Sequence, residues 1–268
     1  YQLTEHKKDV VKIWWPIYPN STISPYDHQI IPINLTFVVS EWHKLQIVKK
    51  YDAGKISITG SYLEKKTDSQ IAQKESQVKL GIPVNFNNYV LVEASYTSRG
   101  YISINEEALL LEYILSKAKL DKETAFIIKP HPGHKKNNLE ELLSSNCTNN
   151  IYLVDNKSLP FDAINASDFI ITKFSSIGIE AMYLNKPVIS LILDRAKGFK
   201  AFYNASHYLY NINDLDTLLT KILNDNDYKL KWSKIFNRKS KILLKKFNFN
   251  SKISPYVIMA KNLYNHIN

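Results

Sequence analysis

TAFIIKPHPG, residues 124–133, and DFIITKFSSIGIE, residues 168–180, are the two stretches that decide the fold. Each begins with an apolar run typical of a buried strand and then passes into small, polar or basic residues. A helix-type sequence follows at once in the second stretch. The carboxyl ends of parallel strands share one edge of an open α/β sheet, and ligands bind at that edge. The sequence therefore predicts a ligand site there, with an imidazole and a pair of hydroxyls converging from adjacent strand ends.

From about residue 87 onward, short apolar runs alternate with helical apolar spacing. This alternation predicts an α/β fold in which a Rossmann-like parallel sheet carries crossover helices. The predicted strands are 35–40, 55–59, 89–94, 124–129, 151–154, 168–172 and 187–193. The predicted helices are 42–50, 106–119, 139–143, 160–165, 176–184, 214–223, the basic tract from 229, and 255–267.

The chain is expected to contain four regions. The first holds only one β-α-β unit, which is too small for an independent doubly wound domain. In order, the expected regions are 1–63 as a partial N-terminal unit, 64–84 as a connecting helix and linker, 85–228 as a nucleotide-binding domain, and 229–268 as basic C-terminal helices.

The composition narrows the function classes. Of the 268 residues, 44% are hydrophobic, which is enough for a folded core. The single cysteine, Cys147, excludes a disulfide framework and a cysteine-based zinc site and fits a reducing cytosol. No apolar run approaches the ~18 residues of a membrane-spanning helix. The net charge of +10 favours an anionic partner such as a nucleotide.

Lys129 and His131 mark the end of the first quoted strand. A residue that precedes proline is pushed out of the helical region, so His131, between Pro130 and Pro132, is expected in extended backbone. Its ring can then reach a phosphate of a ligand bound at this edge and stabilise negative charge on it. The alternative is a loop histidine that caps a carbonyl. We expect His131 to be catalytic and to bind phosphate, with Lys129 beside it.

Ser175 and Ser176 precede a helix, where free N–H groups and the positive end of the dipole suit a phosphate. Serine is equally an ordinary helix N-cap. Lys173 adds a positive charge, and Gly178 allows close backbone approach or else serves packing. Arg99 follows the strand at 89–94 and can bind a phosphate or carboxylate in bidentate fashion, or lie solvated in its loop. We expect all five residues to contact a phosphate-bearing ligand.

A basic tract without acidic residues runs from residue 229 to residue 246. Apolar residues alternate with the lysines, a pattern that suits a helix lying on anionic lipid. The alternative is a solvated charged face whose apolar side packs on the domain. We expect residues 229–247 to contact an anionic membrane surface.

Four short motifs carry a resemblance to a known fold. They are KPHP at 129–132, SS at 175–176, EA at 180–181 and KPVI at 186–189. Their order resembles the C-terminal half of a GT-B-fold glycosyltransferase. Within that fold they are most similar to bacterial enzymes of capsule and lipopolysaccharide synthesis, the Kdo, sialyl and polysialyl transferases, with CDP-glycerol transferases as cousins. The similarity covers roughly residues 35–193.

The resemblance implies a transferase that moves a sugar from a nucleotide-activated donor, of CMP or CDP type or else UDP, to a bacterial surface glycan or lipid-linked acceptor. It implies that Glu180 binds the ribose hydroxyls, whereas an acid near a helix start also stabilises the dipole. No metal or other cofactor is expected, because cationic and helix-terminal groups can take over the ion's role. The expected location is the cytoplasm, including the inner face of the membrane.

Residues 1–63 resemble only the last piece of the N-terminal GT-B domain, so acceptor recognition and the catalytic base are expected in a missing domain or a partner chain. Three other functions stay open. The first is a sugar-nucleotide epimerase, whose helix starts with Ser-Gly-Gly where this chain has Ser-Ser-Ile-Gly at 175–178. The second is an inactive nucleotide-binding or assembly module. The third is nucleic-acid binding through the basic tract, which is not expected because no nucleic-acid motif is present.

Overall fold

The computed structural model describes residues 13–14, 35–48, 55–60, 72–94, 104–131, 139, 148–155, 158–173, 175–193, 202, 204–247 and 253–267. The chain divides into two compact units, and each is described by itself. One unit comprises Tyr1–Lys66 with Lys245–Asn268, and the other comprises Thr67–Leu244.

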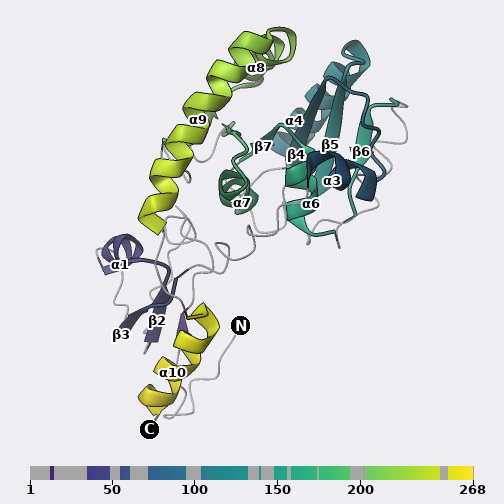
Figure 1. The fold of residues 1–268 in the computed structure, drawn as a ribbon. Coiled ribbons are helices and arrows are strands. Elements are labelled where there is room, and N and C mark those ends of the chain that lie inside the picture. The colour runs from purple at the N-terminus through teal and green to yellow at the C-terminus, as the bar shows by residue number, and fades with distance from the viewer. Residues whose placement is uncertain are drawn as a thin grey trace. The chain divides into compact units, whose positions relative to one another are not determined.

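The larger unit contains a parallel sheet with crossover helices, as the sequence predicts (Figure 1). Within the described residues the sheet has six strands in the order β6-β5-β4-β7-β8-β9. The strands are β4 (Asn88–Ala94), β5 (Thr124–Pro130), β6 (Ile151–Leu153), β7 (Phe169–Thr172), β8 (Val188–Leu191) and β9 (His207–Leu209). The sequence analysis did not predict β9, because three residues are too few to show a period.

The central strand is β4, and all of its residues are buried. It pairs with β5 from Asn88↔Thr124 to Ala94↔Pro130, and on its other side with β7 from Val90↔Phe169 to Val92↔Ile171. Strands β5 and β6 follow on one side of β4, whereas β7, β8 and β9 follow on the other. The strand order therefore reverses between β4 and β7, and such a switch point is where open α/β sheets bind ligands.

Six helices of this unit are described, and they accompany the strands in chain order. They are α3 (Gln73–Lys79), α4 (Ile104–Leu120), α6 (Pro160–Ala166), α7 (Ile177–Tyr183), α8 (Ile212–Asn224) and α9 (Asn226–Phe247). All lie within or overlap predicted regions. Of the helix predicted at 139–143, only Leu139 lies inside the described residues.

One face of the sheet is covered by α4, α8 and α9. Val92 and Ile128 from the strands share one buried cluster with Ile114 of α4, Leu219 of α8 and Trp232 of α9. Side chains alternate between the faces of a strand, so the intervening residues of β4 point to the opposite face. There Gln77 Nε2 of α3 donates to the Ala166 carbonyl at 3.0 Å.

At the amino edge of the sheet, Asp168 joins four elements. Its carboxylate accepts hydrogen bonds from the Tyr89 N–H at 3.1 Å, Gln73 Nε2 at 3.1 Å and Lys229 Nζ at 2.7 Å. The Lys229 ammonium also binds Asn88 Oδ1 at 2.7 Å. These bonds connect α3, α9 and β4 to the start of β7. They fix the positions of these elements relative to one another at the amino edge of the sheet.

The smaller unit confirms the predicted β-α-β unit. Its parallel strands lie in the order β1-β2-β3, and Ser40 Oγ donates to the Lys246 carbonyl at 2.7 Å. Ile13–Trp14 forms a strand that the sequence analysis did not predict. The elements are β1 (Ile13–Trp14), β2 (Leu35–Val38), α1 (Glu41–Val48), β3 (Lys55–Ile58) and α10 (Pro255–Ile267).

A histidine on β9 anchors α9 to the sheet. Trp232 Nε1 donates to His207 Nδ1 at 3.0 Å, and the His207 ring stacks on Phe236 with ring centroids 5.2 Å apart. This bond requires an unprotonated Nδ1. Burial, followed by the charge of Lys239, lowers the pKa of His207.

The lowered pKa makes stability depend on pH. Below about pH 6.5 the unfolded chain binds a proton on this histidine that the folded state resists. The free energy of unfolding should therefore fall between pH 7.5 and pH 5.5. Urea denaturation at both values should show a larger loss for the wild type than for His207→Gln, which keeps an acceptor for Trp232 but does not titrate. Equal losses in the two proteins would contradict this role.

Candidate functional site

His131 lies at the carboxyl edge of the larger unit's sheet, directly after β5. Its side chain is exposed, and its backbone N–H donates to the Ala94 carbonyl at 2.9 Å. That bond continues the pairing of β5 with β4 by one residue, which is the extended conformation that the flanking prolines predict. The imidazole is thus placed at the ligand edge of the sheet.

Ser175 and Ser176 lie between β7 and α7, and both are half-buried. The Gly178 N–H donates to the Ser175 carbonyl at 3.0 Å, and the Ile179 N–H donates to the Ser176 carbonyl at 2.9 Å. Ser176 occupies the N-cap with helical dihedrals, and its hydroxyl makes no capping bond within the described residues. Backbone carbonyls therefore close the first turn of α7, and the capping role that serine often has is not taken by this hydroxyl.

The expectation that His131 and the serine pair come from adjacent strand ends is wrong. His131 follows β5 and the serines follow β7, and β4 lies between these strands. Two strand spacings amount to about 10 Å. A ligand that reaches both groups must cross the end of β4. Arg99 belongs to the segment that leaves β4 there, but it lies outside the described residues.

Lys129 is buried at the end of β5, where its ammonium faces the end of β6. Its Nζ donates to the carbonyl of Asp155 at 3.1 Å and to that of Pro130 at 3.4 Å. Burial lowers the pKa of Lys129, and the Asp155 carboxylate opposes that effect. In this arrangement Lys129 joins two strand ends, and its contact with phosphate stays a prediction.

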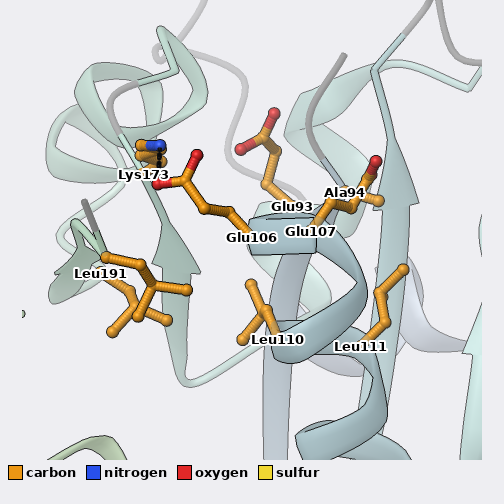
Figure 2. Close-up of a pocket in the computed structure, with 9 residues that line it drawn as sticks. Glu93, Ala94, Glu106, Glu107, Leu110, Leu111, Lys173 and Leu191 are labelled. Atoms are coloured by element: carbon orange, nitrogen blue, oxygen red, sulfur yellow. Dashed lines mark hydrogen bonds and ion pairs between the residues drawn. The ribbon is translucent and has the colours of Figure 1, made fainter. Parts of the chain in front are cut away.

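Lys173 is also buried, and it lies at the switch point between β4 and β7. Its Nζ contacts Glu106 Oε1 in the first turn of α4 at 2.8 Å, and each side chain is only 8% exposed. Figure 2 shows the ammonium turned toward this carboxylate. The structure thus balances the charge of Lys173 on the α4 side of the sheet, so a phosphate contact by Lys173 stays a prediction.

Sequence reasoning missed two buried acids at this point, Glu93 and Glu106. Glu93 Oε2 accepts a hydrogen bond from Thr172 Oγ1 at 3.0 Å, and Glu106 holds Lys173. The signal that was available is the acid inside the apolar strand run YVLVEA at 89–94. A charged residue in such a run is seldom buried without a partner.

A small cavity of about 30 Å³ adjoins the ion pair. Its walls combine the acids of Figure 2 with leucines, among them Leu110 of α4 and Leu191 of β8. This volume admits about one water molecule. It is far too small for a nucleotide, so the cavity marks the switch point and is not itself the donor site.

Comparison with known proteins identifies the family. Residues 47–241 match the family described as CDP-Glycerol:Poly(glycerophosphate) glycerophosphotransferase. The chain belongs to this family. The match covers more than half of the chain and includes His131, the serine pair and Glu180. Among curated proteins, no sequence matches the chain.

Solved structures confirm the fold as half of a GT-B enzyme. The wall teichoic acid polymerase TagF superposes with a TM-score of 0.56 at 16% identity, over 88% of this chain and 58% of that one. HepE of Anabaena in complex with UDP-glucose superposes with a TM-score of 0.55 at 13% identity, over 87% of this chain and 64% of HepE. WaaG, a glycosyltransferase of lipopolysaccharide biosynthesis, superposes with a TM-score of 0.50 at 14% identity, over 91% of this chain and 64% of WaaG. The chain therefore spans about three fifths of the length of these structures.

Metal binding has no support within the described residues. No group of three His, Cys, Asp or Glu side chains among them is placed to hold an ion. Two Asp-x-Asp spacings, at 214–216 and 225–227, went unnoticed in the sequence analysis. Asp216 binds Lys117 Nζ and the Tyr113 hydroxyl, both at 2.9 Å, and Asp225 caps the Tyr228 N–H. Metal independence stays a prediction for this member of the family.

Glu180 and Gly178 lie on α7, and both are buried. At Gly178 a Cβ atom would lie 2.5 Å from Cζ of the Phe202 ring. The ring is fully buried, and the Phe202 N–H donates to the Tyr208 hydroxyl at 2.8 Å, so it has little room to retreat. The structure thus gives Gly178 a packing role, and its predicted contact with phosphate is not needed to explain it.

Gly178→Ala should lower the free energy of unfolding by about 1–3 kcal/mol, because the added methyl group overlaps Phe202. Urea denaturation measures the loss. The double variant Gly178→Ala/Phe202→Leu should recover part of it, since leucine lacks the ring atoms that the methyl meets. A single variant as stable as the wild type would show that the Phe202 ring moves freely.

Proposed function

We propose that the chain binds CDP-glycerol at the carboxyl edge of its six-stranded sheet and provides the donor half of a glycerophosphotransferase. The family match over residues 47–241 is the observation that carries this proposal. A TagF structure soaked with CDPG, with a TM-score of 0.55 at 16% identity, supports the same donor class. The transferred group is then glycerol phosphate, where the sequence analysis expected a sugar.

The chemistry follows from the donor. A hydroxyl of the acceptor, the end of a poly(glycerophosphate) chain, attacks the phosphorus that bears glycerol. The new P–O bond forms as the bond to the bridging oxygen breaks, CMP leaves with that oxygen, and the hydroxyl proton is released. Negative charge accumulates on the phosphoryl oxygens and on CMP, so positioned donors at the site lower the barrier.

Three groups of described residues suit the diphosphate and the ribose of the donor. His131 is exposed at the edge and supplies a hydrogen-bonding or cationic group to the diphosphate. Ser175 and Ser176 offer hydroxyls two strand spacings away. The buried carboxylate of Glu180, one helical turn beyond Ser176, accepts from the ribose hydroxyls. Arg99, in the segment after β4, is proposed for the phosphates that cross between them.

The acceptor and the catalytic base are assigned elsewhere in this proposal. The chain spans 58% of TagF, so we place them in a further domain, on the same polypeptide or on a partner chain. Transfer assays accordingly combine this chain with the proposed acceptor domain, whereas donor binding can be measured on this chain itself.

His131→Ala should abolish transfer from CDP-glycerol, with CMP release falling about a hundredfold or more. The fold should persist because the side chain is exposed. The matched control is Asn149→Ala, an exposed residue in the turn before β6, which should retain full activity. A His131→Ala protein with full activity would overturn the catalytic assignment.

A thermal-shift panel of CDP-glycerol, CDP, CMP, UDP-glucose and GDP fixes the donor, since a ligand of the folded state raises the melting temperature by mass action. The cytidine compounds should give the largest shifts. UDP-glucose as the best ligand would favour sugar transfer, and turnover of it without acceptor would favour an epimerase. Nucleotide binding without any turnover would favour an inactive nucleotide-binding module.

We further propose that α9 contacts an anionic membrane surface. Lys231, Lys234, Arg238 and Lys241 recur every three or four residues and are exposed, so they form one stripe along the helix. Beside the stripe, Ile235 is 52% exposed and Ile242 is 53% exposed, whereas Trp232 and Phe236 of the same helix pack in the core. No described helix is long and apolar enough to cross a bilayer. Contact would therefore be with the lipid surface.

Lys234→Glu/Lys241→Glu should weaken binding to phosphatidylserine vesicles at least tenfold, since each lysine contributes about 1 kcal/mol near such a surface. Co-sedimentation with the vesicles measures the change in binding. Lys74→Glu/Lys221→Glu makes the same charge change at exposed sites on α3 and α8 and should have little effect. Equal losses in both variants would argue against this face, and equally tight binding to generic DNA would favour a nucleic-acid role.

A further inference from the structure

The end of β7 is held by side-chain bonds on both faces of the sheet. Thr172 Oγ1 donates to Glu93 Oε2 of β4 at 3.0 Å. The next residue, Lys173, turns to the other face and binds Glu106 of α4 at 2.8 Å. The Lys173 carbonyl in turn accepts a hydrogen bond from the Ser190 hydroxyl of β8. We call these three bonds the β7 clamp.

The β7 clamp directly precedes the serine pair that the donor phosphates are proposed to meet. Ser175 and Ser176 follow Lys173 after one intervening residue. Glu93 is the penultimate residue of β4, and Glu106 is in the first turn of α4, so both acids flank the segment that connects these elements. The clamp therefore bonds the end of β7, just before the serine pair, to the end of β4 and the start of α4, across the switch point of the sheet.

The β7 clamp consists of polar and charged groups, whose hydrogen bonds form only in certain directions. All of its side chains are buried. A buried ion pair adds little net stability, because the cost of removing both charges from water offsets their attraction. A well-packed apolar pair would hold α4 on β7 at least as firmly, but it would not select one position of α4 along the strand. Hydrogen bonds and ion pairs of fixed geometry make that selection.

We propose that Glu106 and Glu93 are positioning residues, which act through Lys173 and Thr172 to set where Ser175 and Ser176 meet the donor phosphates. This inference rests on the proposed function of the site. Neither acid touches the donor in this scheme. They fix the serine pair relative to β4 and α4, and the cytidine end of the donor is bound independently of them.

The first test removes the ion pair without leaving a buried charge. In Lys173→Met/Glu106→Leu the two side chains are replaced by apolar groups of similar size, a change that proteins commonly tolerate. Calorimetry on the folded protein should show CDP binding at least tenfold weaker than in the wild type, with cytidine binding unchanged. A purely structural role predicts that CDP and cytidine affinities change by the same factor.

The second test removes the other arm of the clamp. Thr172→Val keeps the side-chain shape and deletes the hydroxyl that binds Glu93. The affinity for CDP should again fall relative to that for cytidine. This variant decides the question if the double variant does not fold.

The matched control removes a second ion pair of α4, distant from the carboxyl edge. Lys117 Nζ binds Asp216 Oδ1 of α8 at 2.9 Å. Lys117→Met/Asp216→Leu should leave both affinities unchanged. If the wild type binds CDP and the clamp variants bind it equally well, the positioning role is overturned while the proposed function stands. If the wild type binds no cytidine nucleotide, the proposed function itself has failed.

Discussion

The double pairing of β4 is the constraint on which the rest of the larger unit depends. This strand bonds to β5 on one side and β7 on the other, and every one of its residues is buried. A shift of one residue in either register would turn its side chains to the wrong face. It would also move His131 or the serine pair toward or away from the carboxyl edge by the rise of one residue. The position of each proposed donor contact is thus set by backbone pairing several residues before it.

The charged and polar groups at the two edges of the sheet differ in their contacts and exposure. At the amino edge, Asp168 collects three donors and ties helices to strands. At the carboxyl edge, Lys129 and Lys173 are buried and bonded, whereas His131 is exposed. The buried lysines hold strand ends and the exposed imidazole faces the solvent.

The fold was largely predictable, because the apolar runs at 89–94, 124–129 and 168–172 are long enough to show their period. Strand β9 was not predictable, because its three residues are too few to show a strand period. The resemblance built on KPHP and the serine pair is confirmed, and the family is the CDP-glycerol one that the sequence analysis treated as a cousin. Chain order does not reveal that β4 separates β5 from β7, because adjacency in a sheet depends on which way each crossover turns.

The site was predictable in its ingredients but less so in its contacts. His131 has the extended backbone that its prolines dictate. In contrast, the sequence did not reveal the partners of two other residues, which are Glu106 for Lys173 and the Phe202 ring for Gly178. Long-range partners of this kind leave no local pattern.

The two outermost strands of the sheet, β6 and β9, have three residues each. An edge strand exposes unpaired N–H and C=O groups that can recruit a strand from another molecule. Three residues offer too short a template for stable recruitment. The brevity of these strands therefore protects the sheet from edge-to-edge aggregation, even though its interior is built of the Ile, Phe and Val runs that would otherwise favour it.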